Sequence, residues 1–106
     1  MLRIYSVMLS ALTEMRPVMA QIKRHDTNLE DQLRRAATSV VLNVAEGSGS
    51  RGKNRGARYA TALGSARETV ACLEIATALG YAGAVDAQLC AKLNEVIGTL
   101  VKVAVA

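Results

Sequence analysis

The 106-residue sequence contains no tryptophan, no phenylalanine and a single proline, Pro17. Its aromatic residues other than histidine are three tyrosines. Alanine and leucine are abundant, and proline, which breaks helices, is nearly absent. These features predict one all-α domain over residues 1–106, with room for a single modest core.

Long apolar runs are missing as well. The longest run spans only a few residues, whereas a helix needs ~20 apolar residues to cross a bilayer, so no membrane partner is expected. The N-terminal segment MLRIYSVMLSALTEMRP mixes apolar and polar residues and lacks the uninterrupted apolar stretch of a signal peptide. A cytoplasmic location is therefore expected.

Cysteine and histidine are scarce. Cys72 and Cys90 do not form a CxxC pair, and we expect both to be reduced thiols packed among apolar neighbours. His25, in the polar segment KRHD, is the one histidine, so no set of metal ligands can be assembled. The sequence predicts neither a metal nor another cofactor.

Four stretches carry apolar residues at helical spacing. They predict helices over about residues 2–23, from 28 to 46, from a start at 54–57 to 79, and from 85 to near the end. Short connections between them imply an antiparallel up-down-up-down four-helix bundle. The apolar seam of the first helix keeps its phase through Pro17, so we expect one helix that is kinked there. The four stripes are Tyr5, Met8, Leu12, Met15, Met19 and Ile22; Leu29, Leu33, Ala37, Val40 and Val44; Tyr59, Leu63, Ala66, Val70 and Leu73; and Val85, Leu89, Leu93, Val96, Leu100 and Val103.

The expected helix ends carry familiar signals. Asn28 is expected to cap the second helix, while Gly47 and Gly80 are expected to end the second and third helices. The third helix also carries a second face of small residues, which we expect to let a neighbouring helix approach closely. That face consists of Ala60, Gly64, Ala71, Ile75 and Ala78.

Charge is distributed unevenly along the chain. Residues 1–59 hold ten Lys and Arg against five Asp and Glu, whereas residues 60–106 hold three against four. The segment RGKNRGAR concentrates the excess, and the asymmetry points to an anionic partner for one end of the molecule. The cations assigned to this partner are Arg51, Lys53, Arg55 and Arg58, with Arg34 expected to extend the basic surface.

The stretch GSGSRGKN comes within one letter of a phosphate-binding P-loop. A P-loop needs a strand before the glycines and a Ser or Thr hydroxyl that holds magnesium. Here the segment VVLNVAE before Gly47 has helical periodicity, and Asn54 stands in place of the hydroxyl, so nucleotide binding is not predicted. Two interpretations remain: a flexible connector whose cations contact phosphates of RNA or DNA, or a solvated loop without a ligand.

A polar stripe follows the second helix. We expect it to form, with one residue of the third helix, a structural network between the helices in which arginine pairs with glutamate and Asn43 bridges them, so that the register of the bundle is fixed. The alternative is an active site, but no residue resembles a nucleophile beside a base, and Ser65 is interpreted as a packing residue, so no enzyme is predicted. The network residues are Arg35, Ser39, Asn43, Glu46 and Glu68.

Two segments, QLRRAATSVVLNVAEGSG (32–49) and RYATALGSARETVACLEIATALGY (58–81), resemble the bacterial four-helix-bundle proteins known as ribosomal-RNA intervening-sequence proteins. Some of those proteins are encoded within inserts in large-subunit rRNA genes, and the resemblance covers essentially the whole chain. It implies an antiparallel four-helix bundle that assembles as a homopentameric ring. It also implies a relationship in fold to the accessory variability determinant of diversity-generating retroelements, a basic ring that works with a reverse transcriptase on nucleic acid. The lack of Phe and Trp and the extra glycines and arginines of the loop depart from the family pattern.

Composition also favours self-association, because the apolar fraction is high for so small a bundle and the C-terminal VKVAVA is almost entirely apolar. The resemblance adds RNA or DNA, and a reverse transcriptase or another protein, as partners. Two functions follow. One is a non-catalytic nucleic-acid-binding or accessory module that repeats its basic loop around an oligomer; the other is a structural scaffold that self-assembles and binds no nucleic acid.

Overall fold

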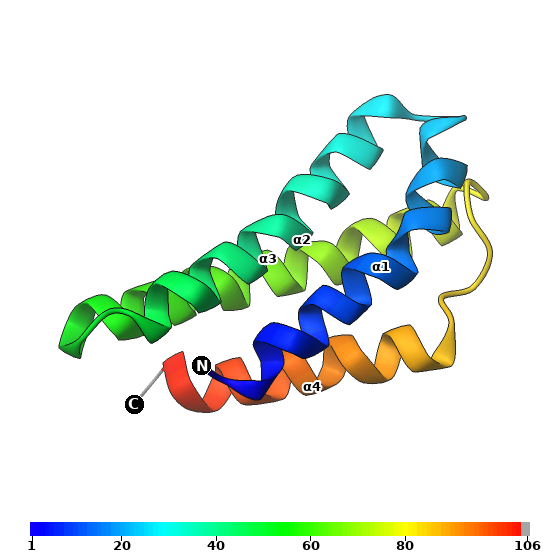
Figure 1. Cartoon of the computed structure of the whole chain (residues 1–106). Helices are drawn as coiled ribbons and strands as arrows, with labels where there is room; N and C mark the ends of the chain where they lie inside the picture. Colours follow the sequence, from blue (N-terminus) through cyan, green and yellow to red (C-terminus); the bar gives the residue numbers. More distant parts are fainter. Residues whose placement is uncertain (105–106) are drawn as a thin grey trace.

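The computed structural model describes residues 1–104 and consists of helices joined by short connections (Figure 1). The helices are α1 (Arg3–Lys23), α2 (Thr27–Ser48), α3 (Gly52–Ala78) and α4 (Ala87–Ala104). The main contacts join α1 to α2, α2 to α3, α3 to α4 and α4 to α1. The predicted all-α four-helix bundle is therefore confirmed. Within the described residues, no helix combines the length and the apolar composition that a membrane span requires.

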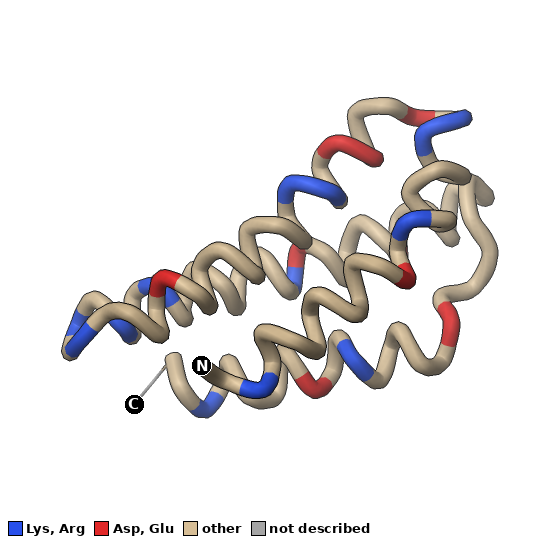
Figure 2. Tube along the Cα trace, in the orientation of Figure 1, with Lys and Arg blue, Asp and Glu red and all other residues tan. Residues whose placement is uncertain are grey.

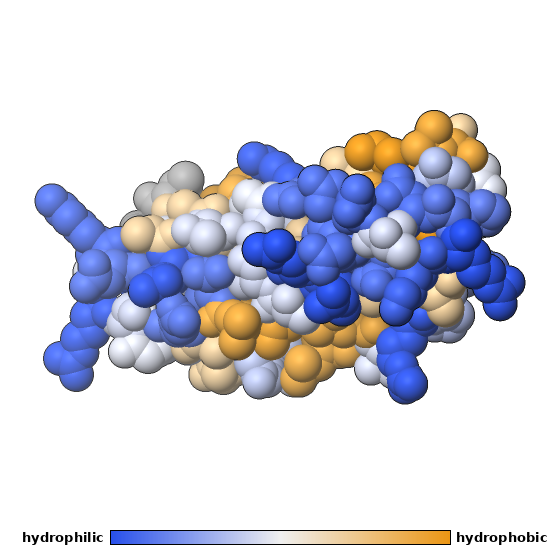
Figure 3. Space-filling model, turned by 90° about the horizontal axis from the view of Figure 1, so that it is seen from above, coloured by the Kyte–Doolittle hydropathy of each residue, from blue (hydrophilic) through white to orange (hydrophobic). Residues whose placement is uncertain are grey.

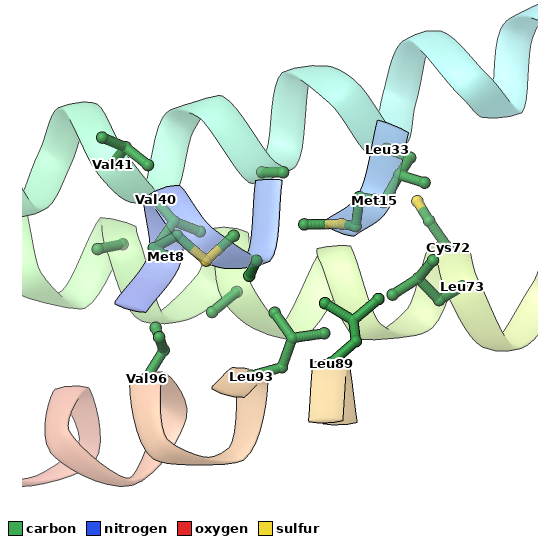
Figure 4. Packing of buried hydrophobic residues seen from close by; sticks show 14 of the residues in the cluster. Met8, Met15, Leu33, Val40, Val41, Cys72, Leu73, Leu89, Leu93 and Val96 are labelled. Atoms are coloured by element: carbon green, nitrogen blue, oxygen red, sulfur yellow. The ribbon is translucent and has the colours of Figure 1, made fainter. Parts of the chain in front are cut away.

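The core is aliphatic, as the composition requires, and side chains of all four helices meet in it (Figure 4). Most members of the four predicted stripes are buried or pack against the buried cluster. The aromatic ring of the core is Tyr59, whose exposed fraction is 5%. The sequence analysis missed part of the buried face of α1 and the fully buried Thr69, whose hydroxyl donates to the Ser65 carbonyl at 2.8 Å. The missed α1 residues are Ile4, Val7 and Ala11.

Two helix starts are set by aspartates that the sequence analysis did not choose. The cap of α2 is Asp26, and the prediction of Asn28 is wrong: the Asp26 side chain accepts a 2.9 Å hydrogen bond from the Leu29 N–H. α4 begins directly after Asp86. The Asp86 carboxylate accepts hydrogen bonds from the N–H groups of Gln88 at 2.9 Å and Leu89 at 3.3 Å. In both places a carboxylate satisfies N–H groups that have no partner within the helix.

Gly47 does not end α2, so this prediction is also wrong. It lies inside the helix and is buried, while α2 continues to Ser48 with Gly49 as its C-cap. A Cβ atom on Gly47 would lie 2.7 Å from Cδ1 of Tyr59, closer than carbon atoms pack. The position needs glycine because the tyrosine ring of α3 rests directly on the α2 backbone.

The ends of α1 and α3 follow the prediction more closely. α1 runs through Pro17 as one helix and ends at Lys23. α3 ends at Ala78, and Gly80 follows with a φ of +77°, a left-handed conformation that favours glycine.

The predicted second face of α3 does not pack against another helix of the chain. Its five small or apolar residues are all exposed, and a Cβ on Gly64 would meet no atom within 4 Å. The buried side of α3 runs instead through Tyr59, Ala62, Ala66 and Thr69. Since α3 has two main neighbours, α2 and α4, this buried side is enough to hold it and the small-residue face is left outside.

Candidate nucleic-acid interface

The predicted basic connector is mostly helix. Only residues 49–51 join α2 to α3, and α3 begins at Gly52, whose φ of +57° lets the chain turn into the helix. Lys53, Arg55 and Arg58 therefore lie on the first two turns of α3 and not on a flexible loop. The prediction of a flexible connector that precedes a helix start at 54–57 is wrong.

The end of the α2–α3 hairpin reaches past the start of α1 and the end of α4 (Figure 1). Lys and Arg residues gather at this end, which is drawn blue in Figure 2. We call it the basic tip and define it as Arg51, Lys53, Arg55 and Arg58, all of which are exposed. A rigid hairpin thus carries its cations at the extremity of a molecule that measures 42 × 24 × 19 Å.

The local electrostatics of the tip are positive for a second reason. The first turn of α3 contains no acidic residue, and its N-cap, Arg51, makes no side-chain capping hydrogen bond. Cations are normally disfavoured at a helix N-terminus, where the macrodipole is itself positive. Within residues 1–104, no carboxylate forms an ion pair with Arg51, Lys53 or Arg55.

Two of the tip arginines are held in place. Arg55 Nε donates a 3.0 Å hydrogen bond to the carbonyl of Ser50, in the connection before α3. Arg58 Nη1 lies 2.8 Å from Glu46 Oε2, and both of these side chains are about half exposed. The Glu46–Arg58 pair links α2 to α3 and offsets one of the four charges. The tip is therefore left with three uncompensated cations.

Arg34 lies away from the basic tip. It is 14 residues before the end of α2, or roughly 20 Å along the helix at ~1.5 Å per residue. Its guanidinium forms ion pairs with Glu30 at 3.3 Å and with Asp31 at 2.5 Å, both on its own helix. The structure thus separates Arg34 from the surface that the sequence analysis expected it to extend.

The predicted polar network is brought together in part. Ser39 Oγ lies 2.8 Å from Ser65 Oγ across the α2–α3 interface. Asn43 Nδ2 donates to the Ser39 carbonyl at 2.9 Å and to its Oγ at 3.1 Å. One hydrogen bond of this cluster, between Ser39 and Ser65, therefore crosses from α2 to α3, with Ser65 as a partner that was expected only to fill space.

The expected pairing of arginine with glutamate occurs between other residues. Arg35 lies 3.6 Å from Asp31 of its own helix, and Glu68 forms no ion pair among residues 1–104. The pair that joins α2 to α3 is Glu46 with Arg58. The predicted arrangement of Arg35 against Glu68 is therefore wrong in its partners, although a polar link between these helices exists.

The sequence analysis missed a second polar cluster, which we call the α1–α4 seam. Arg3 Nε lies 2.7 Å from Glu95 Oε2, and Lys92 Nζ lies 2.8 Å both from Ser10 Oγ and from Glu14 Oε1. The hydrogen bond from Arg3 and the negative charge of Glu95 raise the pKa of the guanidinium. Arg3, Ser10, Lys92 and Glu95 also line a shallow cleft of about 460 Å³. No spacing along α1 or α4 alone marks this cluster, because it forms only where the two helices pack together.

Little in the described part of the chain resembles a reactive centre. Burial, and secondarily the charge of Glu68, raise the pKa of the Cys72 thiol, so it stays protonated at neutral pH. Cys90 is a half-buried free thiol. His25 stacks on Tyr81 with ring centroids 5.1 Å apart. Among residues 1–104, no group of three His, Cys, Asp or Glu side chains is placed to hold a metal ion.

Fold and surface together define a four-helix bundle whose central hairpin ends in a cationic tip. The chain belongs to the 23S rRNA-intervening sequence protein family, whose sequence profile matches residues 2–102. The match includes the basic tip and the whole α2–α3 hairpin. Among curated proteins and among solved structures, no significant match to the chain is found.

Proposed function

We propose that this protein is a non-catalytic, self-associating module that binds RNA or DNA through the basic tip. The observation that carries the proposal is the placement of Arg51, Lys53 and Arg55 at the projecting end of a rigid hairpin, with no carboxylate of the described chain paired to them. A cation whose only role is structural stabilises the fold most when it pairs with a carboxylate of the same chain. These three are instead available to an anion from outside the chain.

Phosphate contacts account for the chemistry of this interface. A guanidinium or ammonium group that neutralises a phosphate releases a condensed counterion, which makes binding strong at low salt and weak at high salt. Such contacts position a protein on nucleic acid without reading its bases. Because Lys53 and Arg55 lie on α3 and Arg51 is its N-cap, less backbone conformational entropy is lost on binding than for cations on a flexible loop.

Self-association would multiply this weak interaction. Large apolar side chains are exposed on α2 and α3, with exposed fractions of 61% for Leu42, 46% for Ile75 and 56% for Leu79. Ile75 belongs to the exposed small-residue face of α3, and Figure 3 shows apolar patches beside the polar surface of the bundle. Copies that pack through such patches, in a homopentamer by the resemblance described above, would present several basic tips at high effective concentration.

The proposal is tested with a fluorescent RNA and a fluorescent DNA duplex at about 50 mM salt, where phosphate contacts are strong. The wild-type protein is expected to bind, and the combined substitutions Arg51→Ala, Lys53→Ala and Arg55→Ala are expected to abolish binding. The matched control removes three other exposed cations through Arg16→Ala, Lys23→Ala and Arg24→Ala. An equal loss in both variants would show that net charge, and not the tip, is responsible.

The second candidate is a scaffold that self-assembles and binds no nucleic acid. The exposed apolar residues of α2 and α3 favour it, since they support assembly with or without a nucleic-acid partner. Absence of binding by the wild-type protein would leave this function standing. Light scattering after gel filtration is expected to give a mass several times the 11.2 kDa of one chain; the mass of a single chain would exclude both forms of self-association.

A further inference from the structure

A cleft of about 350 Å³ opens beside the basic tip, where the hairpin meets the ends of α1 and α4. Apolar side chains from three parts of the chain form its wall, and an arginine of the tip stands at its rim. The lining residues are Leu2, Gly52, Arg55, Gly56, Tyr59 and Val103. Its volume lies near the lower end of the range of small-ligand sites, which is about 300–1,000 Å³.

One of the two glycines in the lining is not explained by the packing of the chain. Gly52 has a left-handed φ of +57°, but Gly56 lies inside α3, where glycine costs about 1 kcal/mol relative to alanine. A Cβ on Gly56 would approach the carbonyl oxygen of Ala104 to 3.7 Å, an ordinary van der Waals distance. At position 47 a neighbouring side chain leaves room only for glycine, whereas at position 56 no side chain imposes this limit. Its effect is to leave bare backbone facing the cleft, which allows a ligand to approach closely.

The charges around the cleft indicate what kind of group fits it. Arg55 is anchored to the Ser50 carbonyl through Nε alone, so its terminal nitrogens remain available as donors. Arg51 and Lys53 lie within four residues of it on the same tip. Apolar walls beside a group of cations complement a flat apolar ring that is attached to a phosphate.

We propose that this cleft takes an unpaired base of a single-stranded nucleic acid while Arg55 contacts the adjoining phosphate. The proposal rests on the function proposed above and narrows its partner from nucleic acid in general to single strands. A base in a duplex is held in the stack and has to be extruded at a cost, whereas the base of a single strand turns outward readily. Since Tyr59 is only 5% exposed, the base packs against an apolar wall and is not stacked on an open aromatic face.

The test compares three probes of equal length, about 20 nucleotides, a span longer than typical single-strand site sizes. They are a thymidine strand, the same strand with its bases removed, and a duplex. Wild-type protein is expected to bind the thymidine strand about tenfold more tightly than the abasic strand, the scale of one well-placed base contact. The duplex supplies phosphates at a higher charge density but no accessible base, so its binding is expected to come from phosphate contacts alone.

Gly56→Leu fills the cleft and is expected to remove the preference for the thymidine strand while leaving abasic binding unchanged. Asn54→Leu is the matched control, because it adds the same side chain to the same exposed turn outside the cleft. Should Gly56→Leu fail to fold, Gly56→Ala serves instead, since its Cβ meets only an ordinary contact; it is expected to reduce the preference in part.

Each outcome has a distinct meaning. Loss of the preference in the Gly56 variant, and its retention in the Asn54 variant, supports the cleft as a base site. Equal binding of the three probes by wild-type protein overturns this inference and leaves phosphate binding by the tip in place. If none of the probes binds at about 50 mM salt, where phosphate contacts are strong, the proposed function itself fails, and this inference fails with it.

Discussion

The basic tip and the α1–α4 seam use the same kinds of side chain in opposite ways. In the seam, Arg3 and Lys92 face Glu95 and Glu14 across the two helices at 2.7 and 2.8 Å. At the tip, three of four cations have no such partner within the described residues, and the helix N-terminus beside them makes their position less favourable still. The two regions therefore differ in whether the chain neutralises its own charge.

This difference separates cations that hold the bundle together from cations that are available to a ligand. Lys92 is 30% exposed and Glu14 29% exposed, so the ion pair between them is partly shielded from water. The second carboxylate oxygen of Glu14 is buried without a partner, which makes the pairing of the first more important to the fold. Among the tip cations, only Arg58 pairs with a carboxylate of the described residues. Three substitutions test the contrast, in decreasing order of expected effect.

The largest effect is expected at the α2–α3 interface that supports the tip. Gly47→Ala would place a methyl group against the ring of Tyr59 and is expected to destabilise the protein by about 1–3 kcal/mol, the usual cost of overpacking. Urea unfolding measures this change. Gly64→Ala is the control, because the same substitution at an open helical position should stabilise by about 0.5–1 kcal/mol.

A double-mutant cycle identifies the cause. Tyr59→Leu removes the ring on which Gly47 packs, so Gly47→Ala should cost less in that background than in the wild-type protein. If Gly47→Ala is as stable as the wild type, the close approach of α2 and α3 is not what the interface depends on.

A smaller effect is expected in the seam. Lys92→Met removes the partner of Glu14 and is expected to reduce the free energy of unfolding by about 1 kcal/mol, with little change in nucleic-acid affinity. Adding Glu14→Gln should recover part of the loss, because the seam then contains no carboxylate that has lost its cation. Lys102→Met, at an exposed site without an ion pair among residues 1–104, should leave stability nearly unchanged. A marked loss of nucleic-acid binding in Lys92→Met would contradict the division of roles between seam and tip.

The smallest effect is expected where the tip is partly neutralised. Glu46→Gln releases Arg58 from its ion pair and gives the tip a fourth available cation. Nucleic-acid affinity at low salt should rise a few-fold, and its salt slope should steepen by about 0.9 for each added phosphate contact. Glu68→Gln changes net charge equally but breaks no ion pair, so its effect should be smaller. Identical results for the two variants would mean that Glu46 acts only through net charge.

Apolar periodicity predicted the helices because it depends on the pattern of many residues at once. The identity of the tip cations was also accessible, since Arg51, Lys53, Arg55 and Arg58 form an unbroken basic cluster in the sequence. Arg58 already fell within the predicted third helix. The earlier start of that helix, which includes Lys53, was not accessible, because Gly52 and Gly56 have low helix propensity and resemble a linker. α3 nevertheless begins at Gly52, which takes a left-handed conformation, and buried Tyr59 anchors the helix about two turns later.

The errors at Gly47 and in the seam have a common physical origin. Both depend on what another helix brings to the site, which spacing along one helix does not reveal. Glycine at position 47 is explained only by the ring of Tyr59. In the sequence, Glu14 looks like one of the solvent-exposed residues of an amphipathic helix, and only the packing of α4 shows that Lys92 lies beside it. The small-residue face of α3 was wrongly predicted to be packed for the same reason. The periodicity of one helix does not show how many other helices pack against it.

The most direct test measures how nucleic-acid affinity depends on salt concentration in two variants that lose equal charge. The quantity compared is the slope of the logarithm of affinity against the logarithm of salt concentration. One carries Arg51→Gln and Lys53→Gln at the tip; the other carries Arg3→Gln and Lys92→Gln in the seam. If the tip holds the phosphates, the first variant should flatten the slope by about 1.8 per chain, or about 0.9 for each lost contact, while the second keeps the wild-type slope. Equal flattening in both variants would contradict the assignment of nucleic-acid binding to the tip.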